Sequence, residues 1–74
     1  MPPDLALDVC GLAPPEPMER ILDALNHLAP GQRLAVSIDR EPFPLYRVLD
    51  RHGYAHSFAA VSDSVFSLHI WRHH

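Results

Sequence analysis

The stretch that decides the fold runs from residue 5 to residue 28 and reads LALDVCGLAPPEPMERILDALNHL. Apolar residues alternate over residues 5–9, which predicts a strand that is buried on one face. From Pro17 the apolar spacing becomes that of a helix, with a stripe made of Met18, Ile21, Leu22, Leu25 and Leu28. Prolines between the two patterns stop the strand, and Pro30-Gly31 stops the helix. We therefore predict a strand over residues 5–9 and a helix over residues 16–28.

The rest of the chain repeats this order and adds a hairpin. Apolar alternation returns over residues 34–38, and Pro44 opens a second helix, predicted over residues 44–52 and ended by Gly53. Residues 54–61 and 65–71 read as two further strands. The order βαβαββ predicts a single domain over residues 1–74, an α+β two-layer sandwich with a mixed four-stranded sheet and two helices on one face. The predicted core includes Leu22, Leu25, Val36, Leu49, Leu68 and Ile70.

The composition limits the kinds of partner and the cellular compartment that we expect for this protein. The chain has 74 residues, 47% of them hydrophobic, and a net charge of −3 with no lysine, so it lacks the basic patch of a nucleic-acid binder. No apolar run approaches the length of a membrane span, and the first residues do not resemble a signal peptide. With a single cysteine no internal disulfide forms, which favours the reducing cytoplasm. We expect a cytoplasmic protein with no nucleic-acid or membrane partner and no cofactor.

Two turn motifs carry a family resemblance. Residues 7–17, LDVCGLAPPEP, resemble the signature of the TusA-like (SirA-like) sulfur carriers, in which Asp ends a strand, Gly-Leu follows, and Cys-Pro-x-Pro opens a helix. Residues 39–46, DREPFPLY, resemble the hallmark of an uncharacterised branch of TusA-related proteins, a domain of unknown function. The resemblance implies the strand order 1-2-4-3 with the last strand antiparallel to the others. It also places the sulfur-carrying cysteine at Pro14, so it argues against inherited sulfur transfer.

The first candidate site is the pair of proline-rich turns. Both turns follow parallel strands and precede helices, so they are expected side by side at the edge where open α/β sheets bind ligands. The candidate ligand-binding residues there are Asp8, Glu16, Asp39, Arg40 and Glu41. Helix starts attract anions, and Arg40 suits a carboxylate or phosphate. The structural alternative is that these carboxylates only stabilise the helix starts.

The second candidate site is the outer face of the hairpin. A two-residue turn at Ser62-Asp63 predicts a register that places His56 opposite His69. Tyr54, Phe58 and Trp71 then join the two histidines on the outer face as a candidate interaction surface. The histidine pair also suggests a metal site, although such sites need a third or fourth ligand.

The third candidate is Cys10, which follows the first strand on its outer face. A thiol there suggests a redox or sulfur-carrier role, and the alternative is a spectator cysteine, since reactive thiols need an electropositive setting. No complete catalytic set is evident, so no catalytic residue is assigned. We expect a non-enzymatic binding or adaptor module with another protein as its partner, and we keep two alternatives: a sulfur carrier or redox partner using Cys10, and a metal-binding module using His56 and His69.

Overall fold

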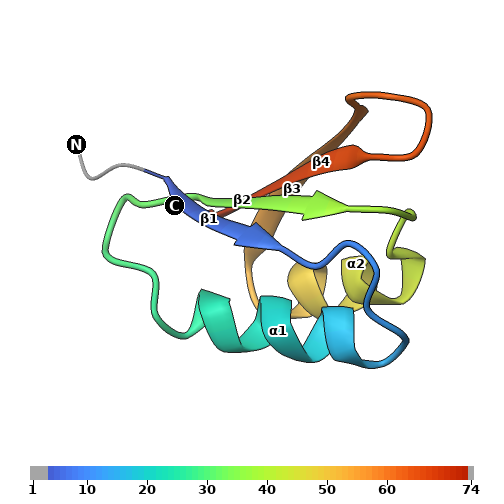
Figure 1. Cartoon of the computed structure of the whole chain (residues 1–74). Helices are drawn as coiled ribbons and strands as arrows, with labels where there is room; N and C mark the ends of the chain where they lie inside the picture. Colours follow the sequence, from blue (N-terminus) through green and yellow to red (C-terminus); the bar gives the residue numbers. More distant parts are fainter. Residues whose placement is uncertain (1–3, 74) are drawn as a thin grey trace.

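The computed structural model describes residues 4–73 and contains the six elements in the predicted order (Figure 1). The elements are β1 (Leu5–Asp8), α1 (Glu16–Leu25), β2 (Leu34–Ile38), α2 (Phe43–Arg51), β3 (Tyr54–Ala60) and β4 (Phe66–Arg72). Both helices lie beneath the sheet in Figure 1, so one sheet face is covered and the other is not. The predicted α+β class and two-layer arrangement are confirmed.

The sheet has the order β1-β2-β4-β3. β1 pairs with β2 in parallel, and β4 runs antiparallel to both of its neighbours, β2 and β3. The order and the antiparallel last strand are those implied by the family resemblance. β1 and β3 are the two edge strands, which differ in length, with four and seven residues.

The core lies between the sheet and the two helices. Each helix contributes two buried side chains, the alternating positions of β2 and β4 contribute five more, and Val9, directly after β1, is the tenth. The buried hydrophobic residues are Val9, Ile21, Leu25, Leu34, Val36, Ile38, Leu45, Leu49, Leu68 and Ile70. Five of the six predicted core residues are therefore buried, and Leu22 is only half-buried because it lines a groove between the two helices.

The helix ends differ slightly from the prediction. α1 stops at Leu25 rather than residue 28, and the ring nitrogen Nδ1 of His27 lies 2.8 Å from the carbonyl oxygen of Asp23 in its last turn. α2 starts at Phe43, one residue early, with Pro44 in its first turn. Neither helix within residues 4–73 combines the length and the apolar character that crossing a membrane requires.

The hairpin register differs from the predicted one by one residue, which reverses the faces of β3. The backbone N–H groups of Val61 and Ser62 both donate to the carbonyl oxygen of Val65, at 2.9 and 3.1 Å. Residues 62–64 thus form a three-residue loop, and His56 lies opposite Ile70 instead of His69. A one-residue shift moves every side chain of a strand to the other face. The prediction of a two-residue turn at Ser62-Asp63 was wrong.

The burial of aromatic side chains explains why this register is favoured. It places Tyr54 and Phe58 on the helix-facing side, where both pack against the core. The rings of Phe58 and Phe66 stack with their centroids 5.1 Å apart. The predicted register would put alanines and serines there instead, and would expose both aromatic rings. Because burying a large side chain contributes about 1.5–3 kcal/mol, the observed register is the more stable one.

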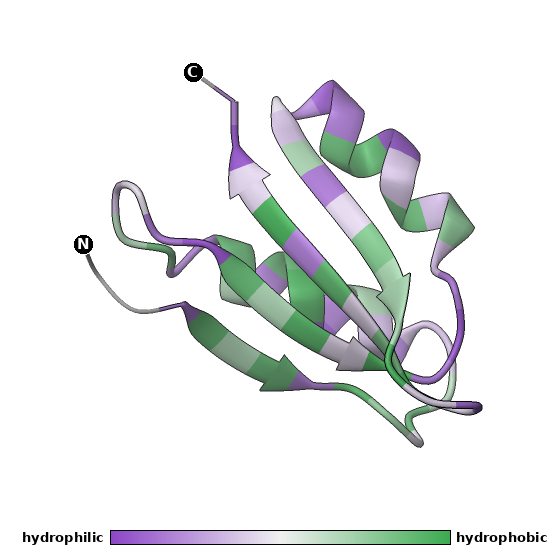
Figure 2. Cartoon of the chain, turned by 90° about the horizontal axis from the view of Figure 1, so that it is seen from above, coloured by the Kyte–Doolittle hydropathy of each residue, from purple (hydrophilic) through white to green (hydrophobic). Residues whose placement is uncertain are grey.

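The uncovered side of the sheet, called the open face below, carries mostly small side chains. Figure 2 looks onto it, with the strands in front of α1. Its residues are Ala6, Asp8, Ala35, Ser37, Ala55, Ser57, Ala59, Ser67, His69 and Trp71. Among the strand residues of this face, His69 and Trp71 of β4 have the large side chains, and Arg33, directly before β2, lies beside Trp71.

Replacing Leu25 tests the core assignment. Leu25 is 3% exposed, so Leu25→Ala is expected to lower the free energy of unfolding by about 2–5 kcal/mol through lost burial and the remaining cavity. Asp23→Ala, an exposed change on the same helix, is the matched control and should change it by less than about 0.5 kcal/mol. Urea denaturation of the three proteins measures both. Equal midpoints for Leu25→Ala and the parent would contradict this core.

Candidate functional site

The two proline-rich turns meet at the carboxyl ends of β1 and β2, as predicted. The backbone N–H of Gly11 in the first turn donates to Oδ2 of Asp39 in the second turn, at 2.9 Å. Gly11 has φ = +80°, a conformation that side-chain-bearing residues rarely adopt. In this turn the backbone N–H of Gly11 points toward the carboxylate of Asp39. The Asp39 carboxylate therefore ties the two turns together.

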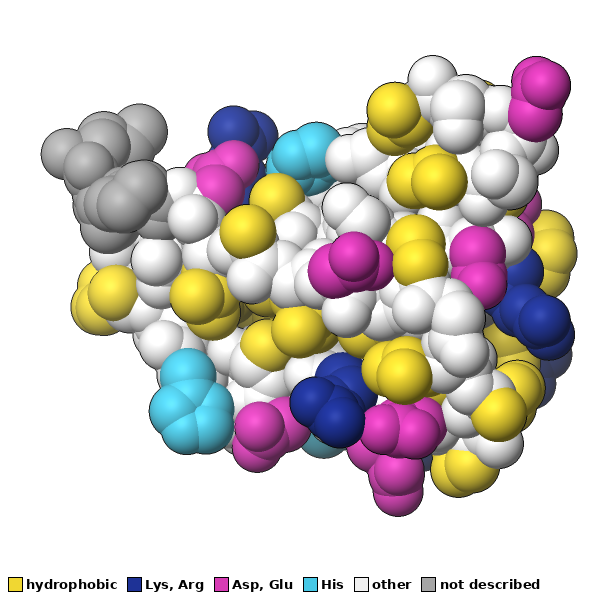
Figure 3. All heavy atoms as spheres, viewed as in Figure 1, with side chains coloured by type: hydrophobic (Ala, Val, Ile, Leu, Met, Phe, Trp, Pro, Cys, Tyr) yellow, Lys and Arg dark blue, Asp and Glu magenta, His cyan; other side chains and the backbone are white. Residues whose placement is uncertain are grey.

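The other candidate carboxylates at this edge also have partners within the chain. Oδ1 of Asp8 accepts a hydrogen bond from the backbone N–H of Cys10 at 3.0 Å. Glu16 forms an exposed ion pair with Arg20 at 3.0 Å, and Figure 3 shows acidic and basic side chains next to one another over α1. Glu41 accepts a hydrogen bond from the hydroxyl of Tyr46 at 2.9 Å. These contacts favour the structural role of the carboxylates over ligand binding.

Arg40 is the exception among the five candidate residues. Its side chain is exposed and makes no ion pair or side-chain hydrogen bond within residues 4–73. Arg40 could therefore offer one charged contact to a ligand. The neighbouring carboxylates already have partners within the chain, so they do not complete a binding site with it. The structure thus brings the five predicted residues to one edge of the sheet. Their polar atoms do not point toward a common centre, because each carboxylate has a different partner.

Tyr46 was not predicted as a site residue, yet it organises the start of α2. Its ring stacks on the ring of His56, with the centroids 4.2 Å apart and the planes 2° from parallel. Burial, the hydrogen bond to Glu41 and the charge of Glu41 raise the pKa of Tyr46 to about 12. The phenol stays protonated at neutral pH and acts as a hydrogen-bond donor that holds Glu41 against α2.

The five predicted hairpin residues divide between the two faces of the sheet. Tyr54, His56 and Phe58 face the helices, whereas His69 and Trp71 lie on the open face. Tyr54 is held by Arg72, whose guanidinium lies 5.5 Å from the ring centre and donates to the hydroxyl at 3.2 Å. The predicted continuous aromatic surface therefore does not form.

The same division removes the geometry of the predicted metal site. His56 is paired with Ile70 and stacked on Tyr46, while His69 is paired with Ser57 on the opposite face. Two imidazoles on opposite faces of one sheet cannot bind the same ion. Residues 4–73 contain no group of three or more His, Cys, Asp or Glu side chains that could hold a metal ion.

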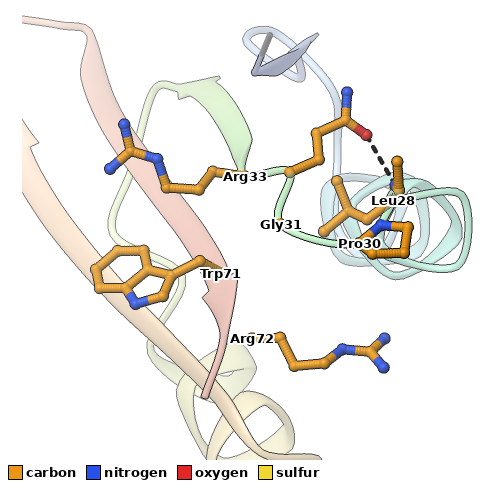
Figure 4. A pocket seen from close by; sticks show the side chains of 8 residues that line it. Leu28, Pro30, Gly31, Arg33, Trp71 and Arg72 are labelled. Carbon is orange, nitrogen blue, oxygen red and sulfur yellow. Dashed lines mark hydrogen bonds between the residues drawn. The ribbon is translucent and has the colours of Figure 1, made fainter. Parts of the chain in front are cut away.

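A pocket of about 330 Å³ lies at the opposite end of the sheet from the two turns. Figure 4 shows the side chains of Arg33 and Trp71 projecting to the same side, away from Leu28 and Pro30 of the loop after α1, which also line the pocket. Arg33 comes directly before β2, so the register of β2 with β4 places it opposite Trp71. Sequence reasoning identified Trp71 and missed Arg33, although alternation from Ala35 would have placed Arg33 on the open face.

The Cys10 thiol lies half-exposed beside the two aspartates of the turns. Partial burial, the hydrogen bond and charge of Asp8, and the charge of Asp39 all raise the pKa of this thiol above its ordinary value. The thiolate is the nucleophilic form of cysteine. Its neighbours therefore disfavour the form that sulfur transfer or redox exchange requires.

The pH dependence of Cys10 alkylation tests this electrostatic setting. We expect the rate with iodoacetamide to rise with a midpoint above the ordinary thiol pKa of about 8.5. Asp8→Asn should lower the midpoint because it removes a negative charge, without restoring it fully, since burial and Asp39 remain. Asp50→Asn, a distant exposed change, should leave it in place. A parent midpoint at or below about 8.5 would contradict the account.

Comparison with known proteins identifies the family. No curated protein and no solved structure was found to match the chain. One protein-family model, described as "Uncharacterized conserved protein (DUF2249)", matches residues 6–72. This range begins in β1 and ends with β4, so it includes both turns and the whole hairpin. The chain therefore belongs to the DUF2249 family of conserved proteins.

Proposed function

We propose that this domain is a non-enzymatic binding module that takes a partner protein through the Arg33–Trp71 end of its open face. The partner segment would insert an apolar side chain beside Trp71 and present a carboxylate to Arg33. The observation that carries the proposal is the placement of this Trp–Arg pair: both residues line the pocket at the end of the sheet, and their side chains project together to the same side.

The chemistry of this pair suits protein recognition. Tryptophan and arginine are enriched among the residues that contribute most to the stability of protein interfaces. Trp71 is half-buried, so its ring is held by the fold yet reachable from solvent. The surrounding small side chains, such as Ala35 and Ala55, allow another backbone to approach closely. A rigid aromatic anchor in a shallow surface needs little ordering on binding.

Charge supports an acidic partner segment. Arg33 pairs with Asp4 at 3.6 Å, but both side chains are more than one-third exposed, at 55% and 38%. Such exposed pairs contribute about 0–1 kcal/mol, so a partner's carboxylate can replace Asp4 at little cost.

The contacts at the two turns support binding rather than a reaction. The carboxylates there are engaged in the fold, and the raised pKa of the Cys10 thiol weighs against the sulfur-carrier or redox alternative. We infer a relation to the TusA-like sulfur carriers from the Asp8–Pro17 motif and the strand order. In that relation Pro14 stands where the carrier cysteine would be. A cytoplasmic location remains part of this proposal, since the one thiol suits a reducing compartment.

Selection of peptides tests the proposed function. A phage-displayed library of random peptides, panned on the domain, should yield sequences that pair an acidic with an apolar residue. The purified peptides should change the fluorescence of Trp71, the single tryptophan. Trp71→Ala and Arg33→Glu should each weaken binding at least about tenfold, a loss of about 1.4 kcal/mol.

The control is Val61→Ala, which alters an exposed apolar residue next to the hairpin loop, away from the pocket. It should bind the peptides like the parent, and circular dichroism should show all variants folded. Selected peptides without acidic residues, or peptides that bind Trp71→Ala as tightly as the parent, would refute the proposed site.

A further inference from the structure

β3 is an edge strand whose outer side is unpaired. Within residues 4–73 it pairs with β4 alone, in an unbroken register from Tyr54–Arg72 to Ala60–Phe66. It is seven residues long, whereas the other edge strand, β1, has four. Edge strands in natural proteins are usually short, or protected by charged residues, prolines or bulges. β3 contains no Asp, Glu, Lys, Arg or Pro and pairs with β4 without a bulge, so its own sequence and register give it no such protection.

The hydrogen bonds at the two ends of the hairpin identify the free backbone groups. Val61 bonds to Val65 at one end, and His73 donates to the carbonyl of Gly53 at the other, both at 2.9 Å. In an antiparallel ladder such hydrogen-bonded pairs alternate with non-bonded ones. The odd-numbered residues of β3 therefore direct their N–H and C=O groups toward β4. The even-numbered residues, Tyr54, His56, Phe58 and Ala60, direct theirs outward.

The side chains next to this edge favour an apolar neighbour. On the helix side, Tyr46 stacks on His56, and Phe43 meets Tyr46 edge-on with centroids 6.1 Å apart. Phe43 is 65% exposed, which is unusual for so large an apolar side chain. On the open face the same strand carries Ala55, Ser57 and Ala59, so that side offers no bulky contact.

The position of α2 indicates which kind of strand can pair with the free edge of β3. In Figure 2, α2 lies on the outer side of β3, away from β4. The stacked rings of Tyr46 and His56 join the two elements. If a second copy paired its β3 with this one, the two α2 helices would lie beneath the same pair of strands and collide. A single extended segment meets no such obstacle, because it brings no second helix beneath the strands.

We propose that the free edge of β3 binds an extended peptide segment of a partner protein as a fifth strand, antiparallel to β3. The segment forms backbone hydrogen bonds with His56 and Phe58 and turns an apolar side chain toward Phe43 and Tyr46. Strand addition of this kind takes its affinity from the main chain and its specificity from alternate side chains. This surface is separate from the Arg33–Trp71 pocket, so the domain can join two partners.

The test uses peptides from the same phage-displayed random library that leave the fluorescence of Trp71 unchanged. In the free domain, amide hydrogen exchange followed by NMR should be fast at His56 and Phe58 and slow at Ser57. Binding of a selected peptide should slow exchange at His56 and Phe58 by at least about tenfold. Because this readout does not involve Trp71, failure here and failure of the proposed pocket are distinguishable.

A pair of substitutions at one position isolates the free N–H group. His56→Pro removes an N–H that points away from β4, so the domain keeps its ladder. His56→Ala removes the same side chain and keeps the N–H. His56→Pro should weaken peptide binding at least about tenfold relative to His56→Ala, with both variants folded by circular dichroism.

Three results would overturn the proposal. The first is equal affinity of the two variants, and the second is a selection whose peptides leave His56 and Phe58 unprotected. The third is protection of these amides in the free domain that increases with protein concentration, which would make a second copy the occupant.

Discussion

The pairing of β3 with β4 is the constraint on which the chemistry of this domain depends. The carbonyl of Val65 accepts hydrogen bonds from both Val61 and Ser62, which closes a three-residue loop. The loop length fixes the register, and the register decides which side chains of β3 face the helices. Tyr54, His56 and Phe58 are consequently drawn into contact with the core or α2, while the open face keeps small residues around Trp71.

A second constraint acts at the other end of the sheet. Asp39 accepts the Gly11 N–H, Asp8 accepts the Cys10 N–H, and Glu41 accepts the Tyr46 hydroxyl. Carboxylates that look like a ligand site in the sequence thus hold the two turns and the start of α2. The two binding surfaces that we propose are the backbone edge of β3 and the Arg33–Trp71 pocket.

Local patterns were sufficient to predict the element order and most of the core. Helical spacing placed Ile21 and Leu25 in the apolar stripe of the first helix, and alternation gave the buried face of β4. Both predictions succeeded because each apolar stripe packs against one neighbouring layer. The face of β3 was not predictable in the same way. Tyr54, His56 and Phe58 alternate with alanines and a serine, so either face is compatible with the local pattern, and only the length of the loop separates the two registers.

The candidate sites required contacts between distant residues, which explains the mixed outcome there. The sequence predicted that Asp8 and Asp39 lie at one edge of the sheet. The hydrogen bond from the Gly11 N–H to Asp39 joins residues of two different turns, so no local sequence pattern predicts it. Trp71 was placed on the outer face as part of the predicted hairpin, and this face of β4 was assigned correctly although the register with β3 was not. Its neighbour Arg33 was missed, since their pairing depends on the register between β2 and β4.

Cross-strand NMR contacts test the register most directly. The observed pairing makes His56–Ile70 and Phe58–Leu68 non-hydrogen-bonded pairs, in which the Cα atoms approach to about 4.5 Å. Strong nuclear Overhauser effects are expected between the Hα atoms of each pair. Such an effect between the Hα atoms of His56 and His69 would show the alternative register instead, and would contradict both the faces assigned to β3 and the free edge derived from them.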